Sequence, residues 1–241
     1  ASSPERVAAL ATSAKVSPKR CVAILLSALG SHEPRVRAAA LELAARTESP
    51  ELTKALIARL REAPDDQKAS LVRTLGQRGD KAALPAILPL LDAKDQGVRI
   101  AAIEALATLG DATTVEKLLS VAATETGATQ AAARRTLALV EAAGADARLR
   151  GFARHPDPRI RAEAIQALAA RGATAATPTF LAATTDPDAQ VRRAAVEAVA
   201  QLGTDKDFQP LLSAWLAAKE PGDLPAFEKA LTAIAQRAGD K

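Results

Sequence analysis

The chain has 241 residues, of which 48% are hydrophobic and 25% are charged, and its formal net charge is +4. This balance excludes an intrinsically disordered polymer, because there is enough apolar side chain to bury a core. The apolar residues are nearly all Ala, Leu, Val and Ile, with four Phe, one Trp, and no Tyr or Met. Since Ala and Leu favour helices and aromatic residues favour strands, the composition predicts an all-α protein.

Several further classes are excluded by what the sequence lacks. Cys21 is the only cysteine, so there is no internal disulfide framework, and no apolar run reaches the roughly 18 residues that span a membrane. The first residues read Ala-Ser-Ser-Pro without a methionine, which predicts a processed mature protein or one domain of a larger polypeptide. We expect it to be cytoplasmic or, after removal of a signal peptide, periplasmic or secreted.

A period of 31 residues runs through the chain and indicates repeated structural units. Similar helical stretches begin near residues that are 31 positions apart: Arg37, Lys68, Arg99, Gln130, Arg161 and Arg192. A series of large apolar residues keeps the same step: Leu25, Leu56, Ile87, Leu118, Leu149, Phe180 and Leu211. A third series follows it: Leu75, Leu106, Leu137, Leu168 and Val199.

The expected elements begin with an N-terminal half-repeat cap over residues 1–16, with its helix at about 4–14. Six regular repeats follow over 17–203, and a C-terminal repeat with a longer turn occupies 204–241. Together they are predicted to form one solenoid domain over residues 1–241. Each repeat is expected to hold two helices of roughly 11–14 residues joined by short turns.

The sixth repeat shows the expected pattern most clearly. Its first helix is predicted at about 176–184 and its second at about 189–202, with a turn at Asp186-Pro187-Asp188 between them. The second helix carries an apolar stripe of helical period: Val191, Ala195, Ala198, Val199 and Leu202. A single hairpin cannot bury such a stripe, so the repeats are expected to stack on one another.

Glycines follow the predicted second helices at Gly79, Gly110, Gly172 and Gly203. Helices often end on a residue with positive φ, which glycine adopts at little cost, so we expect that conformation at all four positions. Asp80 and Asp111 follow two of these glycines and are predicted to cap the next helix.

Two strings resemble the second-helix signature of HEAT repeats. They are Asp-Pro-Arg-Ile-Arg-Ala-Glu-Ala-Ile-Gln-Ala-Leu at 157–168 and Val-Arg-Arg-Ala-Ala-Val-Glu-Ala at 191–198. They are most similar to the short bacterial subtype named after phycobilisome lyases, and the resemblance extends from about residue 17. It implies an α/α superhelix, a right-handed α-solenoid of about seven hairpins whose second helices line the concave face. The motif residues build the stack and do not specify a function.

The repeated arginines illustrate this distinction. As a functional feature, Arg37, Arg99, Arg161 and Arg192 would form a ladder that binds phosphates or an acidic peptide. As a structural feature, each would bond to turn carboxylates such as Asp157 or Asp188 and to carbonyls of the adjacent repeat. We favour the structural role, because this ladder belongs to the fold signature.

Positions of the second helices that point away from the apolar stripe are predicted to bind a partner. The candidates are Glu42, Arg73, Ile100, Glu104, Arg135, Leu139, Gln166, Arg193 and Glu197. Near the middle of the chain this surface is predicted to be small and apolar: Ile100, Ala101, Ala131, Ala132, Leu139 and Ala162. Because the charges alternate and no aromatic residue is present for base stacking, nucleic acid is a poor partner and a protein or peptide a better one.

Two places break the repeat. Arg134 occupies a position that is apolar in the other repeats, and Asp146 and Arg150 replace apolar residues in the next first helix. Buried charges need partners, so we expect these groups to pair, as Arg134 could with Asp146, to reach solvent or to mark a change of register. As a functional feature, the segment would form a kink or docking point. The second break, at residues 219–223, is interpreted as a longer turn before a last helix at about 225–237.

The sequence contains no recognisable catalytic, cofactor or metal site. His32 and His155 are about four repeats apart, and one His-Glu pair is too few for a deoxyhypusine hydroxylase, the di-iron enzyme built of HEAT repeats. Cys21 is interpreted as a packing residue. We therefore predict a non-enzymatic scaffold for a protein or peptide partner. The alternatives that the resemblance implies are a bilin lyase or chaperone-like subunit and a glycosylase-like DNA-binding protein.

Overall fold

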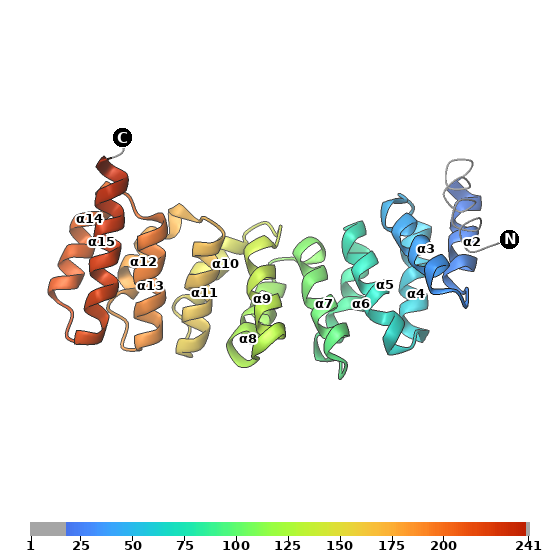
Figure 1. Ribbon diagram of the computed structural model, residues 1–241, viewed down its shortest axis with the longest axis horizontal. Helices are drawn as coiled ribbons and strands as arrows, with labels where there is room; N and C mark the ends of the chain where they lie inside the picture. Colours follow the sequence, from blue (N-terminus) through green and yellow to red (C-terminus); the bar gives the residue numbers. More distant parts are fainter. Residues whose placement is uncertain (1–17, 240–241) are drawn as a thin grey trace. The chain divides into compact units, whose positions relative to one another are not determined.

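A computed structural model describes residues 18–239 (Figure 1). All regular elements in that range are helices, which confirms the all-α solenoid fold. The chain forms two compact units, residues 1–110 and residues 111–241. The predicted N-terminal cap at 1–16 lies outside the described residues.

The first unit contains three hairpins that follow one another in chain order (Figure 1). They are α2 (Pro18–Leu29) with α3 (Pro34–Arg46), α4 (Pro50–Glu62) with α5 (Asp65–Arg78), and η1 (Lys81–Ala83), α6 (Leu84–Ile87) and η2 (Leu88–Asp92) with α7 (Gln96–Leu109). The first helix of the third hairpin is divided into short segments because Pro85 and Pro89 lack the backbone N–H that a continuous helix needs.

The second unit contains four hairpins, again in chain order (Figure 1). They are α8 (Thr114–Thr124) with α9 (Gly127–Leu139), α10 (Ala145–Phe152) with α11 (Pro158–Ala170), η3 (Thr174–Ala176) and α12 (Thr177–Ala183) with α13 (Ala189–Leu202), and α14 (Asp205–Leu216) and η4 (Pro221–Asp223) with α15 (Leu224–Gly239). The described residues thus contain the seven hairpins that the period predicts.

The core of each unit consists of the residues that recur every 31 positions. All members of the first-helix series, from Leu25 to Leu211, are at most 1% exposed, and those of the second-helix series, from Leu75 to Val199, are 0% exposed. Burying one large aliphatic side chain contributes about 1.5–3 kcal/mol to stability. The period therefore identifies the residues that hold neighbouring hairpins together within each unit.

Glycine ends second helices in two different conformations. Gly79 and Gly172 are left-handed, with φ of 66° and 67°, as expected. The expectation was wrong for Gly110 and Gly203, whose φ values are −62° and −63°. Glycine is needed at position 203 for space, because a Cβ there would lie 2.6 Å from the carbonyl oxygen of Val199. The predicted caps are confirmed: Asp80 accepts from the N–H of Ala82 and Asp111 from the N–H of Thr113.

An arginine precedes each of the two left-handed glycines and caps the second helix of the preceding hairpin. Arg78 donates to the carbonyl oxygens of Ala44, Thr47 and Ser49, at 2.6 Å for Thr47 and 2.9 Å for Ser49. These oxygens lie at and just beyond the C-terminus of α3, where carbonyls have no partner within the helix. A positive charge also interacts favourably with that end of the helix dipole.

Arg171 repeats this arrangement in the second unit. Its Nη1 donates to the carbonyl oxygens of Leu137 and Val140, both at 3.0 Å, and its Nε donates to Asp146 at 2.5 Å. The acceptors lie 34 and 31 residues before the arginine, as do Ala44 and Thr47 before Arg78. The same contact therefore connects consecutive hairpins in both units.

We expect Arg78→Ala to lower the free energy of unfolding by about 2 kcal/mol, because it leaves partly buried carbonyl oxygens without their charged donor. The matched control is Arg73→Ala, an exposed arginine on the same helix, which should change stability by at most about 0.5 kcal/mol. Urea unfolding followed by circular dichroism measures both. Equal effects of the two substitutions would contradict a capping role for Arg78.

Candidate protein-binding surface

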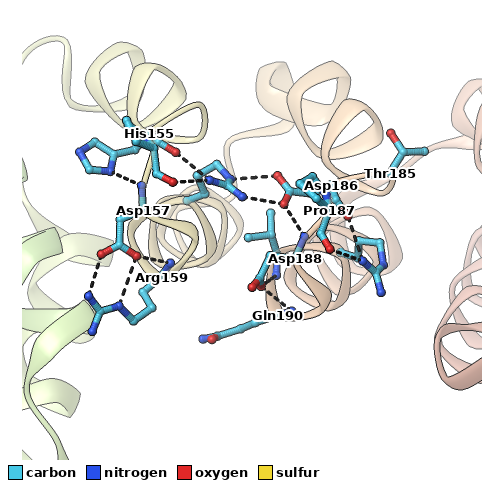
Figure 2. Close-up of polar contacts among 12 residues, drawn as sticks. His155, Asp157, Arg159, Thr185, Asp186, Pro187, Asp188 and Gln190 are labelled. Carbon is cyan, nitrogen blue, oxygen red and sulfur yellow. Dashed lines mark hydrogen bonds and ion pairs between the residues drawn. The ribbon is translucent and has the colours of Figure 1, made fainter. Parts of the chain in front are cut away.

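The turns that join the two helices of a hairpin are built around the arginine ladder (Figure 2). Nη1 of Arg161 donates to the carbonyl oxygens of His155 and Pro156, at 2.8 and 3.0 Å. Its Nε and Nη2 bind both carboxylate oxygens of Asp186, in the turn of the next hairpin, at 2.9 and 2.7 Å. The hydrogen bonds to Asp186 raise the pKa of Arg161. This bidentate pair fastens one turn to the next.

Arg192 makes the same contacts one repeat later. Its Nη1 donates to the carbonyl oxygens of Asp186 and Pro187, both at 3.0 Å, and its Nε donates to Asp223 at 2.6 Å. The structural interpretation of the ladder is therefore confirmed at these two positions. The expected partners were wrong: the carbonyls belong to the arginine's own turn, and the carboxylates belong to the next one.

The expected carboxylates, Asp157 and Asp188, cap helices instead (Figure 2). Asp157 accepts from the backbone N–H of Arg159 at 2.9 Å, and Asp188 accepts from that of Gln190 at 2.8 Å. Two hydrogen bonds from Arg159 lower the pKa of Asp157, with the larger effect from its side chain and the smaller from its backbone. An N-cap carboxylate is held by unpaired N–H groups at the start of its own helix, which directs it away from the ladder.

We use the term second-helix face for the solvent-accessible sides of α3, α5 and α7 in the first unit and of α9, α11 and α13 in the second. The nine predicted partner-binding residues all have accessible surface. Seven are exposed: Glu42, Arg73, Glu104, Arg135, Leu139, Arg193 and Glu197. Ile100 and Gln166 are partly exposed. Leu139 is 65% exposed, which is unusual for a large apolar side chain.

The structure brings two of these residues together in one groove. Arg73 on α5 and Glu104 on α7 line a cavity of about 260 Å³ between the two helices. The helices approach closely because Gly76 has no side chain: a Cβ there would lie 2.9 Å from the Cβ of Ala105. Thr108 adds a bond across the groove, donating from its hydroxyl to the carbonyl oxygen of Gly76 at 2.6 Å.

The predicted small apolar surface is narrower than expected. Ala101, Ala132 and Ala162 are 0% exposed, so they belong to the packed interior of their units and not to a binding surface. Their side chains are small because neighbouring helices approach closely at these positions. The accessible apolar residues of this group are Ile100, Ala131 and Leu139.

The polar break contains an ion pair that was not predicted. Arg134 on α9 binds Glu163 on α11 through Nε and Nη2, at 2.9 and 2.5 Å. The side chain of Glu163 is 2% exposed and that of Arg134 is 44% exposed. The hydrogen bonds to Glu163 raise the pKa of Arg134. The expected pairing of Arg134 with Asp146 was wrong, because Asp146 binds Arg171.

The 31-residue period contains a sequence signal for the pair of Arg134 and Glu163. Glu163 stands in a series whose other members in the neighbouring repeats, Ala101, Ala132 and Ala194, are all alanine. Two departures from the period in adjacent repeats, of opposite charge, indicate side chains that meet. Arg150, the third residue of the predicted break, is exposed on α10 and needs no buried partner.

The histidines and the cysteine have structural surroundings. Nδ1 of His155 accepts from the backbone N–H of Asp157 at 3.0 Å, and the ring of His155 lies 6.1 Å from that of Phe152. Cys21 is 1% exposed, in agreement with a packing role. Residues 18–239 include no group of three or more side chains suited to hold a metal ion, and none of their helices is long and apolar enough to cross a membrane.

A family profile of HEAT repeats matches residues 53–138 and 145–232, which is more than half of the chain. The chain belongs to the HEAT-repeat family. A comparison with curated proteins found no match.

Solved structures similar to this HEAT-repeat chain include the karyopherin Kap121p. One crystal structure of Kap121p has a TM-score of 0.65 and 15% sequence identity, with coverage of 98% of this chain and 34% of Kap121p. Kap121p bound to Pho4p has a TM-score of 0.66 and 16% identity, with coverage of 92% and 30%. This chain thus spans about a third of the length of Kap121p, and the likeness shows a shared fold.

The complex of CpcE and CpcF of phycocyanin lyase from Nostoc sp. PCC7120 is also similar, with 19% identity and a TM-score of 0.45. The match covers 91% of this chain and 95% of the other.

We expect Arg134→Ile to lower the free energy of unfolding by about 3 kcal/mol, because it leaves Glu163 buried without its counterion. The double variant Arg134→Ile and Glu163→Ala restores the residue types of the neighbouring repeats and should be close to wild type in stability. Thermal unfolding of the single and double variants measures the coupling between the two positions. Additive losses would contradict the buried pair.

Proposed function

We propose that this protein is a non-enzymatic interaction scaffold that binds a protein or peptide partner through its second-helix face. The observation that carries the proposal is the exposure of Leu139, at 65%, on a surface where arginine and glutamate residues recur. An accessible apolar residue on a face that also carries charges of both signs is typical of protein interfaces, which have apolar centres and polar rims.

The groove between α5 and α7 supports this proposal. Gly76 and Ala105 in its wall are small and apolar, while Arg73 on α5 and Glu104 on α7 supply opposite charges. Its volume of about 260 Å³ is below the roughly 300–1,000 Å³ of small-molecule pockets, which favours part of a larger ligand, such as a peptide side chain. Opposite charges on its two sides would fix the direction in which the peptide lies.

The disposition of charge favours a protein partner over nucleic acid. A nucleic-acid surface gains affinity from several cations that face phosphates together. Arg161 and Arg192 are each neutralised by an aspartate, and Arg78 and Arg171 are directed to carbonyl oxygens. The charge of these four arginines therefore stabilises the fold and is not available to phosphates.

We expect the double variant Ile100→Asp and Leu139→Asp to bind peptide ligands at least about tenfold more weakly, because it places charges at the apolar positions of the second-helix face. The ligands are selected from a random twelve-residue phage library on the purified wild-type chain and measured by fluorescence anisotropy. Circular dichroism establishes that the variant is folded.

Leu216→Asp is the matched control, because Leu216 is also a large apolar residue, 73% exposed, but lies on the first helix α14. It should leave peptide binding unchanged. If Leu216→Asp abolished binding while the double variant did not, the partner surface would be on the first helices. Failure of the library to yield any ligand would contradict a peptide-binding scaffold.

A further inference from the structure

Arg37 in the first unit has the same anchoring contacts as Arg161 and Arg192. Its Nη1 donates to the carbonyl oxygens of Ser31 and His32, six and five residues before it, at 2.8 and 3.0 Å. Arg161 and Arg192 use the same nitrogen and the same two sequence offsets. The guanidinium of Arg37 is therefore held from the same side as theirs.

The other edge of this guanidinium distinguishes Arg37 from Arg161 and Arg192, and within residues 18–239 Arg99 likewise has only a carbonyl acceptor. In Arg161, Nε and Nη2 form a fork that binds both oxygens of a carboxylate, and in Arg192 Nε binds one. Among the described residues, no carboxylate pairs with Arg37, although Glu62 stands at the position equivalent to Asp186. Glu62 is exposed at the C-terminus of α4, whereas Asp186 lies within a turn. Within the described part of the chain, Arg37 thus lacks the carboxylate partner that the fold provides for Arg161 and Arg192.

Arg37 lines a cavity of about 220 Å³ that opens at this place. A second arginine, Arg59, also lines it and uses Nη2 to donate to the carbonyl oxygen of Leu29 at 2.6 Å. The remainder of the wall includes the aliphatic side chains of Leu41 and Leu71. The cavity therefore combines two guanidinium groups with an apolar wall.

The balance of charge around the cavity favours an anion. Asp66, the one carboxylate among the lining residues, is exposed, and within the part of the chain that the structure describes no ion pair joins it to Arg37 or Arg59. Two fixed positive charges thus face one solvated negative charge. Because part of each guanidinium is already used by carbonyl oxygens, the remaining N–H groups are preorganised for a ligand.

We propose that this cavity binds the carboxylate of an aspartate or glutamate side chain of a partner peptide, with a neighbouring aliphatic residue of the peptide against Leu41 and Leu71. The carboxylate takes the place at Arg37 that Asp186 takes at Arg161. This inference rests on the proposed function and adds the chemistry of the ligand. Arginine binds carboxylates with two parallel hydrogen bonds, which gives specificity as well as affinity.

The location of the cavity supports a peptide as the source of the carboxylate. Arg37 and Leu41 belong to α3 and Leu71 belongs to α5, so two second helices line the cavity, as they do the groove of Arg73 and Glu104. The first helices α2 and α4 add Leu29 and Arg59 to the wall of the cavity. Both sites include residues of α5 and are in the same unit. A chain molecule can occupy both, whereas a free anion would be held by Arg37 and Arg59 alone.

The test uses the peptides selected on the wild-type chain, which should share an acidic residue next to Leu, Ile or Val. Arg37→Gln should weaken binding of such a peptide about tenfold or more, and replacing the acidic residue of the peptide by its amide should cause a similar loss. The two changes together should cost little more than either alone, because they remove the same contact. Arg46→Gln, an exposed arginine on the same helix, is the matched control and should have no effect.

Two further variants test the geometry of the contact and the role of Glu62. Arg37→Lys keeps the charge but loses the fork, and it should bind with intermediate affinity. Glu62→Gln removes the carboxylate at the position equivalent to Asp186, which could compete with the peptide for Arg37. It should preserve or increase the affinity for the peptide. If Glu62→Gln instead lowered the melting temperature as much as Arg37→Gln does, Glu62 would be the native partner of Arg37 and the proposal would be overturned.

The outcomes separate this inference from the proposed function. If Ile100→Asp with Leu139→Asp weakens binding and Arg37→Gln does not, the scaffold stands and the carboxylate site fails. If Arg37→Gln alone weakens binding, the carboxylate site stands and the positions of Ile100 and Leu139 are not part of the binding surface. If neither does, both proposals fail. Competition by acetate as effective as by the peptide would indicate a general anion site and would also overturn the inference.

Discussion

The last turn of a helix leaves carbonyl oxygens without partners, and at α3, α9 and α13 an arginine of the following hairpin supplies the missing donors. Arg78 and Arg171 reach acceptors 31 and 34 residues before them, so the length of the repeat and the reach of the side chain fit one another. Arg237 makes the same contact with acceptors 34 and 37 residues before it. The difference of three residues corresponds to the longer turn around residues 219–223. The last hairpin thus keeps the interaction although it departs from the period.

The same side-chain chemistry operates at the intra-hairpin turns, where the ladder arginines bind carbonyls of their own turn, and Arg161 and Arg192 also bind an aspartate of the next. Because the guanidinium groups of Arg161 and Arg192 are paired within the fold, their charge is not available to a partner. The repeating arginines and the binding residues are therefore largely different sets. Stability depends on positions that recur in every hairpin, whereas recognition must depend on positions where the hairpins differ, such as the exposed Leu139.

The sequence was sufficient to predict the order of the helices, the apolar series and the number of hairpins, because each of these depends on spacing along the chain. The expected length of roughly 11–14 residues was wrong for the first helices α10 and α12, which have 8 and 7 residues. The second helix expected at about 189–202 is observed at Ala189–Leu202. Spacing does not determine which partner a long side chain reaches, and Arg134 was assigned to Asp146 for that reason. The prediction of positive φ was wrong at Gly110 and Gly203 for a related reason, because spacing does not determine the backbone conformation that ends a helix. Helices that end in Arg-Gly have a left-handed glycine, whereas those that end in Leu-Gly, at Gly110 and Gly203, do not.

The ion pair of Arg134 and Glu163 indicates how such a repeat can acquire specific features. An arginine in an apolar series and a glutamate in an alanine series would each be costly alone, because a buried charge requires a counterion. Together they are compatible with the fold, since each satisfies the other across adjacent second helices. Where the period places an arginine without its carboxylate, as at Arg37, the packing of the repeat is complete but the electrostatic pair is not, and a partner molecule can supply the missing group.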